Sequence, residues 1–204
     1  MMIEVKRAAD LGESHRRAIT RIFVDGFGPD LSYFSKDPDK LTDALAHMLV
    51  LDLFYVGLVH GESAGIVACT DGRQRAVRHD VRELRRRLGL VKGTIAHLSF
   101  SREFEKPLPY ARERMASLEF VATGPAFRGQ GVASAIIQHL LALPQYDEYV
   151  LDTIADINTP ALRLYEKLGF TEFKRTKVHH AKITGIGAYV GMRLVQRGLR
   201  SRTV

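Results

Sequence analysis

Hydrophobic and polar positions alternate along this chain with two different periods, and each period predicts a type of element. Apolar residues recur every three to four positions in four segments, as they do in helices that bury one face. The segments are residues 12–25, 41–50, 131–143 and 160–168. Residues 27–39 are rich in Gly, Pro and Asp, and this composition predicts a loop.

Shorter apolar runs predict strands, and two of them form a hairpin across the polar turn Gly61-Glu62. The expected strands are residues 2–8, 53–60, 63–70, 118–123, 149–154, 171–182 and 187–195. Strands come first, strand and helix then alternate, and strands close the chain. This order predicts a single α/β domain with a mixed sheet over residues 1–196, followed by a basic tail at 197–204.

The composition fits one globular domain, with 204 residues, 46% hydrophobic residues and 26% charged residues. No run approaches the ~18 apolar residues of a membrane span, and the first residues lack the pattern of a signal peptide. Cys69 is the one cysteine, so no disulfide can form within the chain. We therefore expect a soluble cytoplasmic protein with no membrane partner.

The positive charge is concentrated in one segment. The whole chain carries a net charge of +7, and residues 72–114, predicted to be an insertion, carry +7 by themselves. Within them, residues 79–92 predict a basic amphipathic helix that ends at Gly89. Its apolar positions are Val81, Leu84 and Leu88, and its basic ones are Arg82, Arg85, Arg86 and Arg87. Such a helix either attracts nucleic acid, a membrane surface or an anionic ligand, or simply exposes a solvated face.

A glycine-rich turn joins the strand expected at 118–123 to the helix that follows. Gly129 and Gly131 would let a ligand approach the backbone, and the first turn of the helix would offer free N–H groups to an anion such as pyrophosphate. The turn is no P-loop, because Gln130 and Gly131 stand where Lys and Ser/Thr are required. It also lacks the dinucleotide fingerprint, because Ser134 replaces the third glycine.

Residues 158–170 form the second informative segment. Thr159 can cap the expected helix and Pro160 suits its first turn. One face of this helix is apolar and consists of Ala161, Leu164, Tyr165 and Leu168. On spacing alone, Tyr165 is therefore a core residue.

Both segments resemble hallmarks of one family. Arg128-Gly-Gln-Gly-Val-Ala133 resembles the Arg/Gln-x-x-Gly-x-Gly/Ala signature of the GCN5-related N-acetyltransferases, the GNAT family. The pattern Asn-x-x-Ala-x-x-Leu-Tyr-x-Lys-x-Gly-Phe, from Asn158 to Phe170, is similar to the second hallmark of that family. The resemblance is close over about residues 115–172, and the remainder fits in outline.

The resemblance implies a mixed, mostly antiparallel sheet, flanked by helices and splayed between strands four and five, with acetyl-CoA in the opening. Acetyl-CoA would be a cosubstrate, and no metal is expected. By the matched positions, the residues that would bind it are Val121, Ala122, Thr123, Arg128, Gly129, Gln130, Gly131, Val132, Ala133, Ser134 and Asn158.

The implied enzyme is an acyltransferase that moves an acetyl group directly from acetyl-CoA to a primary amine of a small molecule or a protein. Tyr165 would protonate the departing thiolate, and Glu119 is the candidate base, through water. Glu119 could instead be a strand carboxylate that faces solvent or an arginine. His97, His179 and His180 are substitute bases, and related enzymes often have no dedicated base.

Two other functions stay open at this point. One is a non-catalytic acyl-CoA-binding sensor, and the other is a nucleic-acid binder built around the basic helix. The paired motifs favour the enzyme, and a nucleic-acid partner is not expected. The sequence leaves open the acceptor amine, a longer acyl donor and a homodimer.

Overall fold

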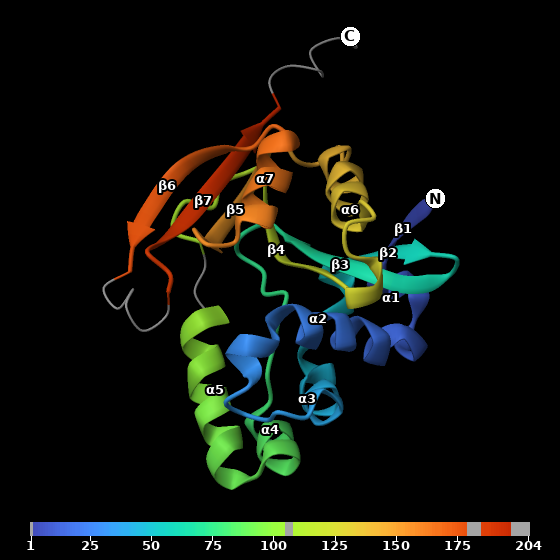
Figure 1. Ribbon diagram of the computed structural model, residues 1–204, viewed down its shortest axis with the longest axis vertical. Coiled ribbons are helices and arrows are strands. Elements are labelled where there is room, and N and C mark those ends of the chain that lie inside the picture. The colour runs from blue at the N-terminus through green and yellow to red at the C-terminus, as the bar shows by residue number, and fades with distance from the viewer. Residues whose placement is uncertain (1, 105–107, 179–184, 197–204) are drawn as a thin grey trace.

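The computed structural model describes residues 2–104, 108–178 and 185–196. Its centre is a sheet in the order β1-β2-β3-β4-β5-β7-β6 (Figure 1). The strands are β1 Ile3–Arg7, β2 Phe54–Val59, β3 Glu62–Thr70, β4 Met115–Thr123, β5 Glu148–Ala155, β6 Thr171–Lys177 and β7 Ala188–Val195. Every neighbouring pair is antiparallel except β4–β5, which is parallel. The mixed, mostly antiparallel sheet that the sequence predicted is confirmed.

Helices cover both faces of this sheet. They are α1 Ala8–Leu11, α2 Arg16–Leu31, α3 Pro38–Leu45, α4 Val81–Leu88, α5 Leu90–Phe104, α6 Val132–Leu141 and α7 Thr159–Lys167. The buried residues of α6 and α7 join one hydrophobic cluster, whereas those of α1 to α5 join a second cluster on the other face. We call these the α6 face and the α2 face. Within the described ranges, no helix is both long and apolar enough to cross a membrane.

Close packing fixes α6 on its face. A Cβ atom added to Gly65 in β3 would lie 2.7 Å from Cγ1 of Val132, the first residue of α6. Any side chain at Gly65 would therefore push the start of this helix away from the sheet. The position of the preceding loop thus depends on a glycine far from it in sequence.

The parallel pair β4–β5 separates after a few residues. Its register runs only from Met115 opposite Glu148 to Ser117 opposite Val150. Farther along, each strand carries a non-glycine residue in the left-handed region, Phe120 with φ 52° and Thr153 with φ 59°. Both lie where the register with the outer neighbour strand shifts, as at a β-bulge. The splay predicted between strands four and five is therefore present.

An aromatic cluster holds the bulge in β4. The Phe120 ring lies 5.3 Å from that of Phe23 and 5.8 Å from that of Phe27, both on α2, and 6.2 Å from that of Phe54. A left-handed conformation costs an L-residue roughly 1–2 kcal/mol. Packing of Phe120 on α2 offsets this cost.

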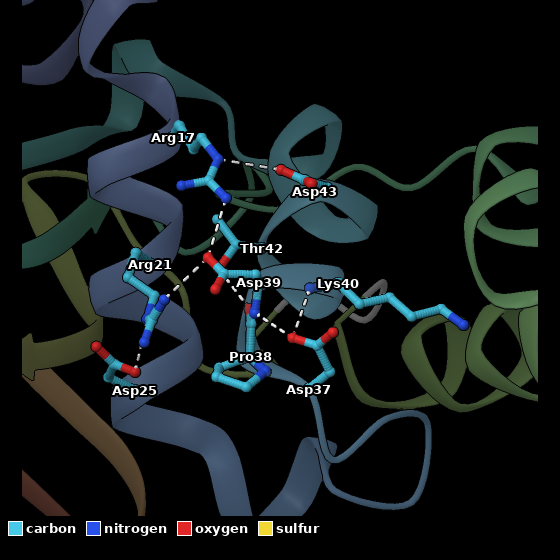
Figure 2. A network of polar contacts seen from close by, with 9 residues as sticks. All are labelled: Arg17, Arg21, Asp25, Asp37, Pro38, Asp39, Lys40, Thr42 and Asp43. Atoms are coloured by element: carbon cyan, nitrogen blue, oxygen red, sulfur yellow. Dashed lines mark hydrogen bonds and ion pairs between the residues drawn. The ribbon is translucent and has the colours of Figure 1, made fainter.

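Surface ion pairs connect α2 to α3 (Figure 2). Arg17 contacts Asp39 at 3.0 Å and Asp43 at 3.2 Å, and Arg21 contacts the same Asp39 at 3.1 Å. Asp37 caps α3 by accepting hydrogen bonds from the amides of residues 39 and 40. Exposed pairs of this kind contribute about 0–1 kcal/mol each, so they orient α3 more than they stabilise it.

Several local predictions were wrong. Residues 27–31, expected to be loop, belong to α2, which bends at Phe27 and contains Pro29 near its end. Asn158, and not Thr159, caps α7, because its side chain accepts the hydrogen bond of the Ala161 amide. The basic segment holds a second helix, α5, that the sequence did not indicate. The predicted tail 197–204 and part of the strand expected at 171–182 lie outside the described residues.

Candidate functional site

A glycine cradle opens at the end of β4. Gly129 and Gly131 adopt φ of 74° and 82°, and a Cβ atom at either position would meet nothing within 4 Å. The amide of Ala135 donates to Gly131 O, so the three preceding amides of α6 precede the first hydrogen bond of the helix. These N–H groups lie at the positive end of the helix dipole, which suits an anionic ligand.

The two long side chains of this loop brace it from within. Arg128 Nε donates to Thr123 O at 3.4 Å, and its Nη2 lies 3.5 Å from Asp25 O on α2. Gln130 Nε2 donates to Ala126 O at 2.8 Å. The backbone of the loop, not these side chains, is therefore turned to the opening.

The ladder between β4 and β5 ends at Ser117 opposite Val150 within the described residues. On its other side, β4 continues to pair with β3 up to Thr123, with the bulge at residues 120–121. The part of β4 beyond Ser117 includes Val121, Ala122 and Thr123 and leads directly into the cradle. An extended ligand could pair with such a segment as an added strand does.

Tyr165 lies on the α6 face of the sheet. It is 5% exposed, and its ring centroid is 6.2 Å from that of Phe170. Burial raises the pKa of Tyr165 well above its ordinary value, because the phenolate would lose its hydration. The hydroxyl therefore stays protonated at neutral pH and can donate a proton. Tyr165 also belongs to the hydrophobic cluster of the α6 face, as its helical spacing predicted.

Glu119 lies on the opposite face of the sheet. Leu118 belongs to the cluster of the α6 face, and successive residues of a strand point to opposite sides. Thr70 Oγ1 donates to Glu119 Oε1 at 3.1 Å. Burial raises the pKa of Glu119, and this effect exceeds the opposing effects of hydrogen bonds from Ser117 and Thr70 and of the Arg75 charge. A raised pKa makes this carboxylate a better proton acceptor than an exposed one.

The structure adds a second carboxylate that the sequence analysis missed. Asp152 stands two residues past Val150 on β5, as Glu119 stands two residues past Ser117 on β4. Its Oδ2 accepts a hydrogen bond from the Tyr110 hydroxyl at 2.5 Å and lies 3.2 Å from Lys174 Nζ. No local pattern could reveal this trio, because its members come from three distant segments.

A shallow hollow adjoins this trio on the α2 face. Its volume is about 190 Å³, and its lining residues are Tyr110, Arg112, Glu148, Val150, Phe173 and Arg193. The Tyr110 and Phe173 rings meet edge to face at 5.5 Å, and Lys174 Nζ lies 5.6 Å from the Tyr110 centroid. Aromatic walls with charged groups near them suit a small polar ligand.

The remaining candidates have other places. His97 lies on α5, where its ring packs 4.8 Å from that of His79, and His179 and His180 lie outside the described residues. Cys69 is buried, and burial raises the pKa of its thiol to about 12, so it is no nucleophile. No three His, Cys, Asp or Glu side chains of the described ranges gather where they could hold a metal ion.

The fold and the cradle together define an α/β protein that presents an anion-binding helix start beside a split sheet. A scan against family models matches residues 17–170 to the acetyltransferase (GNAT) family. The chain therefore belongs to the GNAT family, as the resemblance of its two motifs implied. Acetyl-CoA is the cosubstrate, and the protein is an acetyl-CoA-dependent acetyltransferase.

Solved structures share this fold at low sequence identity. An N-acetyltransferase from Staphylococcus aureus Mu50 is 18% identical, covers 94% of this chain and 100% of its own, and has a TM-score of 0.60. The ribosomal-protein-S18-alanine N-acetyltransferase from Escherichia coli is 15% identical, covers 100% and 99%, and has a TM-score of 0.57. An acetyltransferase from Salmonella typhimurium, solved with its cofactor acetyl-CoA, is 14% identical, with the same coverage and TM-score. A search of curated proteins finds no match to this chain.

Proposed function

We propose that this protein is an N-acetyltransferase that moves the acetyl group of acetyl-CoA directly to a primary amine. The observation that carries the proposal is the split between β4 and β5, with a protonated tyrosine on one face and a carboxylate of raised pKa on the other. A thioester held in this opening would be reached from both faces at once. Direct transfer requires such access, because donor and acceptor must meet without a covalent enzyme intermediate.

The cradle would hold the pyrophosphate of the cosubstrate through backbone amides. The start of α6 and the segment of β4 that has separated from β5 offer the donors and acceptors in one continuous run. We assign cosubstrate binding to Val121, Ala122, Thr123, Arg128, Gly129, Gln130, Gly131, Val132, Ala133, Ser134 and Asn158. Arg128 and Gln130 would act by fixing the shape of the loop, because both side chains bond within it or to its neighbours.

Tyr165 would supply the proton and Glu119 would remove one. Acetyl-CoA contributes an activated acetyl group with a thiolate as leaving group. The Tyr165 hydroxyl, kept protonated by burial, would donate its proton to that sulfur. Glu119, on the α2 face, would accept the proton of the incoming amine through a water molecule.

Thermal unfolding with and without acetyl-CoA tests cosubstrate binding. A ligand at 100 times its dissociation constant stabilises the folded state by about 2.7 kcal/mol. Gly131→Asp places a carboxylate at the cradle and should abolish this shift. Gly61→Asp is the matched control, because Gly61 also has φ of 82° and open space around it but lies in the β2–β3 turn. Loss of the shift in both variants, or in neither, would contradict the proposed cradle.

Release of free thiol from acetyl-CoA in the presence of a panel of amines tests the transfer. The panel contains polyamines, amino acids and peptides with free N-termini or lysines. An amine that accelerates thiol release and gains 42 mass units, roughly one acetyl group, would identify the acceptor class. A protein that binds acetyl-CoA but releases no thiol with any amine would be the sensor that the sequence left open.

A further inference from the structure

The α4–α5 hairpin forms one end of the molecule. In Figure 1 the hairpin lies at the lower end of the view, away from β6 and β7, and Gly89 forms the turn between its two helices. The two helices approach closely, since a Cβ atom on Gly93 would lie 2.5 Å from Cα of Arg85. Leu84 and Leu88 bury the inner side of α4 in the α2-face cluster. The hairpin is therefore a packed, convex projection.

Two aliphatic side chains at this end are largely exposed. Leu90 is 76% exposed and Val91 is 73% exposed, more than any described large hydrophobic residue except Met2 near the N-terminus. They begin α5 directly after the turn. Leu98, 58% exposed, continues the same side of α5 two turns farther along. Exposed aliphatic residues grouped at a convex end indicate a contact with another apolar phase.

Basic residues dominate the sequence next to this pair. Arg82 and Arg87 are exposed, and within the described ranges neither side chain makes an ion pair or a hydrogen bond; the Arg82 backbone amide donates to Asp80, which caps α4. Arg85 bonds Thr94 at 3.0 Å, and Arg86 pairs with Glu83. Five basic residues and one acidic residue fall between positions 82 and 92. Positive charge beside exposed aliphatic side chains complements an anionic surface with an apolar interior.

We propose that the hairpin tip, residues 82–92, docks this protein on an anionic lipid bilayer. Leu90 and Val91 would enter the acyl boundary while the arginines contact lipid phosphates. The five basic residues of the tip match the phosphates of an anionic bilayer, and aliphatic residues do not stack on bases as a nucleic-acid platform requires. The contact needs no spanning helix, so it is compatible with the absence of one from the described residues.

Co-sedimentation with vesicles tests this docking at low salt. Vesicles of equal parts phosphatidylglycerol and phosphatidylcholine should pellet the protein, whereas pure phosphatidylcholine vesicles should not. Arg82→Gln with Arg87→Gln should lower the partition coefficient about thirtyfold, since each basic residue near the surface contributes a factor of about five. Leu90→Ser with Val91→Ser should lower it at least about tenfold.

Two controls separate docking from misfolding. Val195→Ser removes an aliphatic residue that is 50% exposed on β7, at the other end of the molecule, and should leave partitioning unchanged. All variants should keep the thermal shift with acetyl-CoA, which reports the fold and the cradle independently of lipid.

Four outcomes would overturn the inference. Wild-type protein that stays in the supernatant with anionic vesicles is the first, and equal partitioning of the tip variants is the second. The third is a dimer in light scattering that Leu90→Ser with Val91→Ser dissociates, because a second copy would then cover the tip. The fourth is tight binding of RNA without binding to vesicles, because the basic residues between positions 82 and 92 would then contact nucleic acid.

Discussion

The two faces of the sheet build their halves of the site in different ways. On the α6 face, the cradle and the helix start come from one continuous segment, residues 124–134. On the α2 face, the polar groups come from segments far apart in the chain: Thr70, Tyr110, Glu119, Asp152 and Lys174. The first half is therefore local, and the second depends on the assembled fold.

This difference has a physical origin. Holding a pyrophosphate requires backbone amides and room, which a short glycine-rich turn supplies wherever it occurs. Recognising an acceptor requires side chains at defined positions in space, and these arise only when distant segments are packed together. The strand separation after Ser117 and Val150 joins the two halves.

Tyr165→Phe should produce the largest loss of activity. Removing the hydroxyl deletes the proposed proton donor and leaves the ring packing on Phe170 in place. We expect kcat to fall about a thousandfold, within the range of general acid catalysis. The thermal shift with acetyl-CoA should be unchanged. A variant with nearly wild-type kcat would assign Tyr165 to the core alone.

The sequence predicted the helices of the α6 face and, on the α2 face, helices that correspond to α2, α3 and α4, but it missed the full extent of α2 and the whole of α5. The hairpin β2–β3 and helices α6 and α7 have strong periodicity and clear turn residues, so their places were expected. The continuation of α2 past Phe27 was missed, because Gly and Pro usually end helices and only packing on the sheet overrides that tendency. Helix α5 was missed because its apolar residues are partly exposed and Gly93 weakens the period.

The same contrast applies to the site residues. Tyr165, Glu119 and the glycines could be named because a local motif or strand contains them. Asp152 and Tyr110 could not be named, because they contact each other only in the folded chain, from positions 42 residues apart. The left-handed residues Phe120 and Thr153 gave no sequence signal either, since neither is a glycine.

Ile136→Ala and Leu84→Ala compare how the hydrophobic clusters on the two faces contribute to stability and to acetyl-CoA binding. Both side chains are 0% exposed, one on α6 and one on α4, so each truncation should lower the free energy of unfolding by about 3 kcal/mol. Only Ile136→Ala should also weaken acetyl-CoA binding, because α6 begins at the cradle. Denaturant titration and isothermal calorimetry measure the two effects. Equal losses of acetyl-CoA affinity in the two variants would show that the cradle depends on the cores of both faces.

Glu119→Gln should lower kcat/KM about a hundredfold, at the low end of general base catalysis. In the wild type, kcat/KM should fall on the acid side with a midpoint above the ordinary glutamate pKa of 4.5, because burial raises the pKa of Glu119. The same shift predicts a stability effect. The protonated carboxyl favours the folded state, and this contribution is lost as pH rises through the raised pKa.

The free energy of unfolding of Glu119→Gln relative to wild type should therefore increase from pH 4 to pH 7. Denaturant titrations across this range measure the difference. A constant difference would show that the folded-state pKa of Glu119 is not raised, and the carboxylate would then lose its advantage as a base.

Tyr110→Phe should have the smallest effect, and it tests the α2 face alone. The variant keeps the ring against Phe173 but removes the 2.5 Å hydrogen bond to Asp152. Lys174 still contacts Asp152, and the Tyr110–Asp152 pair is partly exposed. The free energy of unfolding should therefore fall by only about 1 kcal/mol. If the hydroxyl positions Asp152 for the acceptor, KM for the amine should rise about fivefold and KM for acetyl-CoA should stay constant. Tyr146→Phe, which lies beyond the paired end of β5, should change neither constant; an equal rise in both variants would place the acceptor elsewhere.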